Sequence, residues 1–235
     1  LFTITGVTYI SKVFVGQYNG SKQYHLASTV TWQMLILSIF SLIVFLPAYY
    51  FAPYFLPQIA QKHGLEYFRI LMLCGITWPI SSSLASFFIG THQNTVVFIT
   101  LIASNLMNIW LDLKWIPIWG TTGAAWATTV SMIFQIMILF VFFLNPDNNR
   151  KYNTRHVSIN TKMMSKTLVT GYPESVMHFF EMAAWAAVIT IIASEGDEYM
   201  LVSNLAQNIF ILFMFVYTEV GNAVKSFASN YIGEN

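Results

Sequence analysis

The sequence contains long apolar runs without a charged side chain, and one of them extends from Leu26 to Gln61. A transmembrane helix needs about 20 mostly apolar residues to cross the hydrocarbon layer of a bilayer. Of the 235 residues, 56% are hydrophobic and 9% are charged, whereas soluble domains carry about 25% charged residues. The sequence therefore predicts an all-α, polytopic membrane helix bundle. The net charge of +1 gives no indication of nucleic-acid binding.

Polar and proline-rich breaks divide the apolar sequence into seven expected spans. We expect these spans at residues 1–18, 27–51, 65–89, 95–114, 120–144, 163–193 and 199–225. Trp78 and Pro79 predict a kink in the third span, and Asp112 with Lys114 predicts the end of the fourth. Small residues repeat every four positions along 120–131, which favours close packing of two helix backbones.

The distribution of Lys and Arg predicts the orientation in the membrane, because cytoplasmic loops carry an excess of basic residues. The polar segment 146–162 and the residues after it are rich in basic side chains, whereas the loop after residue 193 has none. With 146–162 in the cytoplasm, three basic residues face outward: Lys62, Arg69 and Lys114. The other eight face inward: Lys12, Lys22, Arg150, Lys151, Arg155, Lys162, Lys166 and Lys225.

The first helix resembles the last one at an offset of 213 residues. The identical pairs are Phe2/Phe215, Thr5/Thr218, Val7/Val220, Lys12/Lys225, Phe14/Phe227, Tyr18/Tyr231 and Gly20/Gly233. Six crossings separate the two copies, so both run the same way through the membrane, as in repeats related by an axis along the membrane normal. We therefore expect a full protein of two six-helix lobes, with this chain holding spans two to eight.

This expectation divides the chain into three parts. Residues 1–145 form most of an N-terminal lobe with five spans, and 146–162 form a cytoplasmic linker between the lobes. Residues 163–235 start a C-terminal lobe with two spans.

A stripe of ionisable residues lies within the apolar segment 170–193. Glu174, His178 and Glu181 are spaced i, i+4 and i+7, so they share one face of a helix, and Trp185 continues that face. A charged group at the bilayer centre costs about 2.5 to 3.5 kcal/mol on insertion scales, and such residues mark ion or substrate pathways. We expect this stripe to face a watery cavity inside the bundle.

Several segments together resemble the MATE (multidrug and toxic compound extrusion) family of exporters. Residues 103–112 and 120–128 resemble the N-x-x-N-x-x-L-D and G-x-x-G-A-A-x-A-T segments of the fifth and sixth MATE helices. Residues 15–20 are similar to the end of the second helix. Residues 171–181 resemble the start of the seventh, where a G-x-P precedes a membrane-embedded Glu, and 206–207 resemble the A-x-Q of the eighth.

The resemblance implies a NorM-like antiporter in the cell membrane that exports cationic or aromatic compounds in exchange for Na⁺ or H⁺. It implies no enzymatic activity and no cofactor beyond the coupling ion, and it places Glu181 at the coupling-cation site. Aromatic side chains near the stripe are suited to stack on a flat cation, and an amide on the next helix is suited to a hydrogen bond. The residues that we expect to line the cavity are Glu174, His178, Trp185, Gln207 and Tyr172.

Three alternatives remain open from the sequence. A flippase for lipid-linked oligosaccharides or lipids of the same superfamily needs several basic residues in its cavity, and Lys12, Lys225 and Arg69 are the bases within the spans. An intramembrane metalloenzyme would use the E-x-x-x-H-x-x-E stripe as ligands, although zinc usually has more nitrogen or sulfur ligands. A seven-helix receptor matches the number of spans, but the internal repeat argues against it.

Overall fold

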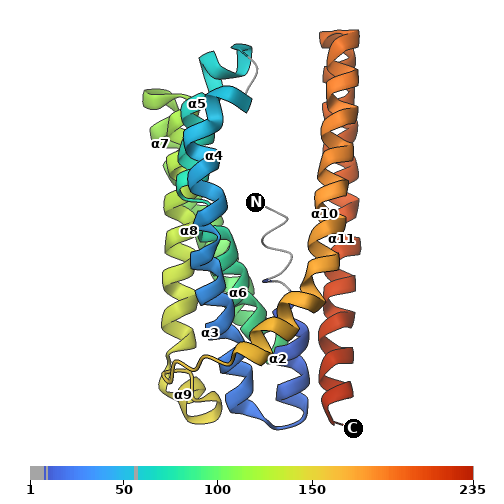
Figure 1. The fold of residues 1–235 in the computed structure, drawn as a ribbon. Coiled ribbons are helices and arrows are strands. Elements are labelled where there is room, and N and C mark those ends of the chain that lie inside the picture. Colours follow the sequence, from blue (N-terminus) through green and yellow to red (C-terminus); the bar gives the residue numbers. More distant parts are fainter. Residues whose placement is uncertain (1–7, 9, 56–57, 235) are drawn as a thin grey trace.

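The computed structural model describes residues 8, 10–55 and 58–234, all of which fold into helices and short turns without a strand (Figure 1). The helices are α2 (Ser11–Gly20), α3 (Tyr24–Phe40), α4 (Leu42–Phe55), α5 (Gln58–Leu73), α6 (Thr77–Gly90), α7 (Asn94–Trp119), α8 (Thr121–Phe143), α9 (Pro146–Tyr152), α10 (Thr161–Glu195) and α11 (Asp197–Glu234). The predicted all-α fold is confirmed.

Within the described residues, five helices are long and apolar enough to cross a membrane, and one bent helix pair adds a sixth. The five are Tyr24–Tyr54, Asn94–Trp119, Thr121–Phe143, Thr161–Glu195 and Glu198–Glu234, and the pair is Gly64–Leu73 with Thr77–Gly90. These correspond to six of the seven predicted spans, although the last helix continues to Glu234, nine residues past the predicted end at residue 225. The predicted span 1–18 is described mainly as α2, and residues 1–7 and 9 lie outside the described residues.

The predicted end of the fourth span at Asp112 and Lys114 is wrong. Helix α7 continues to Trp119 and ends where Gly120 adopts a φ of 59°, a left-handed value that glycine adopts without steric cost. The Lys114 Nζ lies 4.0 Å from the centroid of the Trp110 ring. A lysine that packs over an aromatic ring of its own helix does not need to end that helix.

The predicted kink in the third span is present, one turn before Pro79. Helices α5 and α6 are bent by 47° at the break between Leu73 and Thr77. Because proline has no N–H, it cannot donate to the carbonyl of Gly75, four residues earlier. That carbonyl instead accepts from the backbone N–H of Trp78 at 3.3 Å. Pro79 therefore favours the bend one turn earlier, because the Gly75 carbonyl lacks the N–H donor that an α-helix would supply.

The small-residue stripe of α8 packs as predicted. Gly123, Ala127 and Ser131 are all buried, on the face of α8 that contacts other helices. A Cβ on Gly123 would overlap the backbone carbonyl oxygen of Trp115 in α7. Glycine is thus required where α7 and α8 approach most closely, next to the turn that joins them.

The hydrophobic core lies at the end of the bundle that carries α9. Its aromatic centre is Phe87 of α6, whose ring centroid lies 4.8 Å from that of Phe143 and 5.2 Å from that of Tyr152. These near-perpendicular rings join α6, α8 and α9. Tyr152 is 1% exposed, and its hydroxyl donates to Asn19 Oδ1 at 3.0 Å.

The predicted polar linker 146–162 is more ordered than the sequence indicated, because its first half forms α9. Pro146 starts this helix at a position that needs no N–H donor. Side chains of α3 donate to the linker carbonyls: Ser28 Oγ to Tyr152 at 2.7 Å, Trp32 Nε1 to Thr154 at 2.8 Å and Gln33 Nε2 to Asn160 at 2.9 Å. The linker therefore lies fixed against α3.

The two helices of the predicted repeat, α2 and α11, pack side by side in the same direction (Figure 1). A Cβ on Gly20 would overlap the carbonyl oxygen of Asn230, and a Cβ on Gly233 would overlap that of Gln17. The offset of 213 residues relates Gln17 to Asn230 and Gly20 to Gly233. Each contact is thus the counterpart of the other, which is the pattern that a two-fold axis produces. The packing supports the repeat inferred from the sequence.

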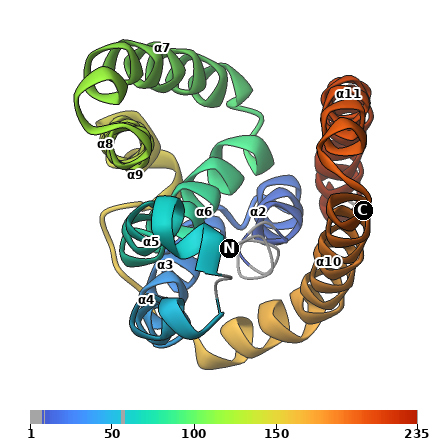
Figure 2. The same ribbon diagram turned by 90° about the horizontal axis from the view of Figure 1, so that it is seen from above.

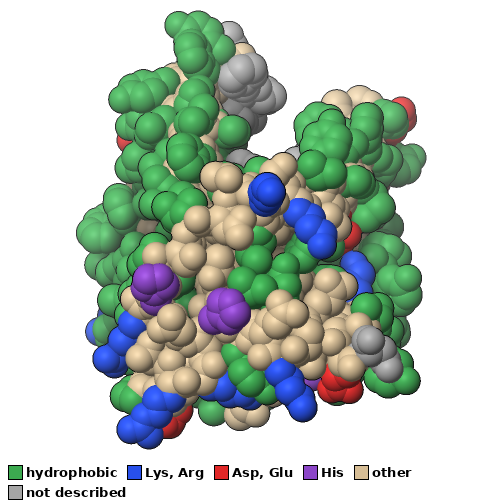
Figure 3. Space-filling view, turned by 60° about the horizontal axis from the view of Figure 1, so that its bottom comes forward, with side chains coloured by type: hydrophobic (Ala, Val, Ile, Leu, Met, Phe, Trp, Pro, Cys, Tyr) green, Lys and Arg blue, Asp and Glu red, His purple; other side chains and the backbone are tan. Residues whose placement is uncertain are grey.

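Helices α2 to α9 form a first bundle, and the α10–α11 pair lies along one side of it (Figure 2). The side-chain bonds between α11 and this bundle, within the described residues, involve α11 from Asn222 onward, near its C-terminal end. Toward the opposite end the two groups separate, and the surface is hollowed between them (Figure 3). The molecule is closed at the α9 end.

The α9 end is also rich in basic side chains (Figure 3). Its exposed Lys and Arg residues are Lys22, Arg150, Lys151, Arg155, Lys162 and Lys166. This distribution agrees with the predicted orientation, in which the α9 end faces the cytoplasm.

Candidate functional site

The ionisable stripe of α10 follows the seam between α10 and α11. The Lys225 Nζ of α11 lies 3.2 Å from Glu174 Oε1. Two to three turns further along α10, the ring of Trp185 packs against Phe210 of α11, with 6.1 Å between the ring centroids. The expected shared face therefore exists, and it contacts α11. The described residues do not enclose it as a cavity.

Glu181 differs from Glu174 in its partner. Its Oε2 lies 3.2 Å from Nδ1 of His178, one turn earlier on the same helix, and its side chain is 44% exposed. A histidine carries a positive charge only when protonated, so this contact is not a fixed ion pair. Glu181 lies two turns beyond Glu174, about 10 Å along the helix, on the side away from the closed end. Its carboxylate has no permanent cation beside it among the described residues.

A second polar group joins α2 to α11 at the closed end. Lys12 is 1% exposed, and its Nζ donates to Asn222 Oδ1 at 2.6 Å. The Asn222 amide in turn donates to Glu219 Oε1 at 3.3 Å. Lys12 also interacts electrostatically with Lys225, Glu219 and Glu174. The two repeat-related lysines thus lie within one cluster of charges.

Lys12, Lys225, Glu174 and Glu219 interact with one another, and Glu181 lies two turns further along α10. We call these five residues the inter-lobe charge cluster. Its three carboxylates and two ammonium groups leave one negative charge while His178 is neutral. Glu174 is paired with Lys225, and Glu219 is held through Asn222 beside Lys12. The unbalanced charge is therefore best assigned to Glu181.

A cavity of about 210 Å³ lies between α7 and α11, beside this cluster. Its walls combine the apolar residues Val97, Phe98 and Leu101 of α7 with Glu219 and Asn222 of α11. The cavity therefore provides apolar surface for an organic group next to a carboxylate, at the junction of the two helix groups.

The other two residues predicted to line the cavity, Tyr172 and Gln207, do not take part in the contacts between the α10 stripe and α11. Tyr172 is 67% exposed and lies two residues before Glu174, about 200° around α10. Gln207 of α11 is half-buried. It lies one turn before Phe210, the residue that packs against Trp185. Their roles stay predictions.

The metal-site alternative finds no support in the part of the chain that the structure describes. Within it, no group of three His, Cys, Asp or Glu side chains is placed to hold a metal ion. Glu174 turns to Lys225, so the E-x-x-x-H-x-x-E stripe does not converge on one point.

Sequence reasoning missed a buried polar pair in α7. Asp112 Oδ1 and Asn108 Nδ2 are both buried and have no hydrogen-bond partner among the described residues. They are four residues apart, on one face of an apolar span. An unpaired buried polar group costs about 1 to 3 kcal/mol, so the carboxylate of Asp112 is a second candidate for cation binding. The i, i+4 spacing is the available signal, although the sequence alone predicts that Asp112 lies at the end of a shorter span.

The two repeat-related lysines provide a matched test of how the cluster contributes to stability. We expect Lys12→Met to lower the free energy of unfolding by about 1 to 3 kcal/mol, because it leaves the buried Asn222 amide oxygen without this donor. Lys225→Met should cost less than about 1 kcal/mol, because its ion pair is partly exposed. Thermal unfolding of the two purified variants measures the difference, and equal losses would contradict the assigned contacts.

Known proteins resemble this chain in sequence and in fold. No known family profile matches the sequence. The chain is 23% identical over 188 residues to the probable multidrug resistance protein YoeA of Bacillus subtilis, covering 76% of this chain and 41% of that protein. It is 20% identical over 235 residues to the multidrug resistance protein NorM of Vibrio cholerae, covering 94% of this chain and 51% of that protein. A crystal structure of MATE in complex with MaD5 superposes with a TM-score of 0.83 at 19% identity, covering 99% of this chain and 55% of that one.

The chain is similar in sequence to two multidrug resistance proteins and has the fold of MATE transporters. It spans about half the length of the curated relatives that it matches. The chain is a multi-pass protein of the cell membrane, and the order of its helices is that of the MATE fold.

Proposed function

We propose that the full protein is a cation-coupled antiporter that exports cationic or aromatic compounds in exchange for Na⁺ or H⁺. The observation that carries this proposal is the unbalanced charge of the inter-lobe charge cluster. Glu174 and Glu219 each have a basic or amide partner, whereas Glu181 has only a titratable histidine. The names of the two multidrug resistance relatives support the same class of activity.

In the proposed mechanism, the coupling ion and the exported cation compete for the carboxylate of Glu181. Only one of them neutralises this charge at a time. Coupling requires that the two occupants favour opposite openings of the molecule, because a ligand shifts a conformational equilibrium only through its differential affinity for the two states.

The parallel packing of α2 on α11 supplies a surface on which such a change can occur. Gly20 and Gly233 bring the two backbones into direct contact there. The helix groups are closed at the α9 end and separated at the other, so Glu181 lies on the separated side of the Glu174–Lys225 pair.

The proposal is tested by reconstituting the full-length protein in liposomes under a defined ion gradient. We expect a Na⁺ gradient or a pH gradient to drive ethidium transport. We expect no transport of an anionic dye of similar size. The gradient that is effective identifies the coupling ion. Transport of the anionic dye alone, or transport without any dependence on either ion, would contradict the proposal.

The flippase alternative is favoured by one feature, the presence of both span lysines in the cluster. Each of these lysines, however, has acidic or amide partners in the described structure. A cavity for an anionic lipid-linked substrate needs basic groups in excess over acidic ones, and here the acidic groups exceed the basic ones by one.

A further inference from the structure

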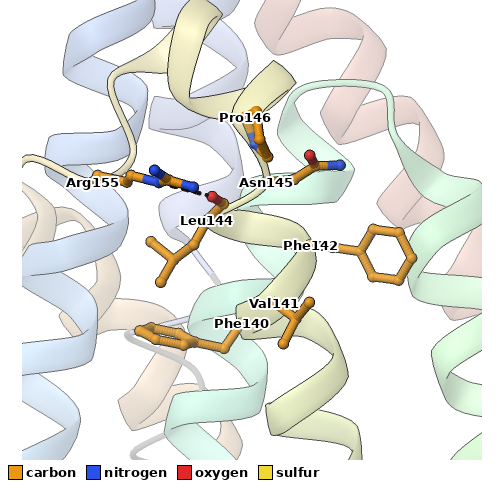
Figure 4. Close-up of a pocket in the computed structure, with 7 residues that line it drawn as sticks. All are labelled: Phe140, Val141, Phe142, Leu144, Asn145, Pro146 and Arg155. Atoms are coloured by element: carbon orange, nitrogen blue, oxygen red, sulfur yellow. Dashed lines mark hydrogen bonds between the residues drawn. The ribbon is translucent and has the colours of Figure 1, made fainter.

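A second cavity lies at the far side of the first bundle, where α8 ends and the linker returns past it (Figure 4). Its volume is about 420 Å³. Phe140, Val141, Phe142 and Leu144 of the α8 end form its apolar part, and Arg155 is the charged residue among those that line it. Figure 2 shows α8 and α9 on the opposite side of the first bundle from α10 and α11, so this cavity is separate from the inter-lobe charge cluster.

The guanidinium group of Arg155 is held in place at the end of α8. Its Nε donates to the Leu144 carbonyl oxygen at 3.1 Å (Figure 4). Its backbone N–H donates to Asn149 Oδ1 at 3.0 Å. Its two terminal nitrogens have no acceptor among the residues that the structure describes. A guanidinium fixed at one edge, with its remaining N–H groups available, is arranged for a phosphate oxygen.

The apolar wall distinguishes the occupant from a simple anion. Helix α8 is an apolar span, and the cavity lies at its last turn, where the hydrocarbon layer meets the headgroups. Val141 is 70% exposed, and Phe142 is also exposed. These side chains lie at the level of acyl chains, whereas Arg155 lies at the level of headgroups. A ligand that uses both surfaces has an anionic head and a hydrocarbon chain.

We propose that this cavity binds one anionic phospholipid, with its phosphate on Arg155 and an acyl chain against Phe140 and Val141. The carbonyl groups at the C-terminus of α8 repel an anion, but the Leu144 carbonyl already accepts from Arg155. The predicted orientation places the cavity in the cytoplasmic leaflet, which carries anionic lipids in excess. The lipid would fasten the linker to the end of α8.

Two arginines of the same linker give a matched test. Arg155 lines the cavity, and Arg150 is an exposed arginine of α9 that does not line it. The full-length protein is purified, stripped of lipid and titrated with phosphatidylglycerol or phosphatidylcholine, and bound lipid is counted by native mass spectrometry. We expect the wild type to retain one phosphatidylglycerol, and Arg155→Gln to weaken that binding about tenfold. Arg150→Gln should stay within about twofold of the wild type, because it changes only the long-range charge.

A third variant leaves Arg155 in place, in case its substitution disturbs the linker. Val141→Trp fills the apolar part of the cavity from an exposed position, so we expect a folded protein that has lost the bound phosphatidylglycerol. Inorganic phosphate should not displace the lipid, because it cannot use the apolar wall. The proposal would be overturned if Arg155→Gln and Arg150→Gln lost phosphatidylglycerol binding equally, or if the wild type retained phosphatidylcholine equally well. It would also be overturned if phosphate displaced the lipid, or if Val141→Trp fully retained phosphatidylglycerol.

Discussion

Glu181→Gln is expected to abolish ion-driven export of ethidium by the full protein, lowering the initial rate at least about 30-fold, which corresponds to about 2 kcal/mol. Glutamine is close in size to glutamate but has no charge. The inter-lobe charge cluster then contains two carboxylates and two ammonium groups, and no negative charge is left for an exchangeable cation. The measurement is gradient-driven ethidium transport in liposomes, with the amount of folded protein checked for each variant.

Two substitutions control for effects other than the lost charge at this position. Glu195→Gln removes an exposed carboxylate at the last residue of α10 and should leave transport unchanged. Glu181→Asp keeps the charge on a shorter side chain and should retain part of the activity. Normal rate and normal ion dependence in Glu181→Gln would show that the coupling charge lies elsewhere, with Asp112 as the next candidate because its Oδ1 is buried without a partner.

Gly20→Ala is expected to lower the stability of the protein strongly, because it adds a methyl group where the backbones of α2 and α11 are in direct contact. Its Cβ would overlap the backbone carbonyl oxygen of Asn230, which cannot move aside as a flexible side chain would. Overpacking of this kind costs about 1 to 3 kcal/mol. Thermal unfolding of the purified full protein measures the loss.

Gly221→Ala provides the matched control within α11. No heavy atom lies within 4 Å of the Cβ position of Gly221, and alanine favours a helix by about 0.5 to 1 kcal/mol over glycine. We therefore expect Gly221→Ala to be neutral or slightly stabilising. If both substitutions lowered the unfolding temperature equally, the tight parallel contact between the repeat-related helices would be ruled out.

The membrane fold was predictable because each apolar run has the length of a span and is bounded by polar residues or proline. Pro79 marked the bend between α5 and α6, although the proline acts one turn earlier through Gly75. The end of α7 was mispredicted because Lys114 looked like a boundary, whereas it packs over Trp110. Helix α9 was missed because a seven-residue helix made of polar residues has no apolar periodicity.

The site was predictable only as a face of one helix. The spacing of Glu174, His178 and Glu181 placed them together on α10, but it gave no partner from another helix. The pairing of Glu174 with Lys225 depends on how α10 packs against α11, which is tertiary information. The burial of Lys12 could not be predicted from the sequence either, because a lysine near the end of a span usually extends to the headgroups. The repeat did indicate that Lys12 and Lys225 are related, and the structure brings both into one cluster.

The central claim, that one carboxylate is shared by alternative cations, is tested most directly by equilibrium competition. Ethidium binding to the purified full protein is titrated with Na⁺ at constant ionic strength, and separately with H⁺. We predict that the coupling ion displaces ethidium with a one-to-one stoichiometry, and that Glu181→Gln binds ethidium weakly and without dependence on either ion. Ethidium binding that neither ion weakens, or an unchanged ion dependence in Glu181→Gln, would contradict the account.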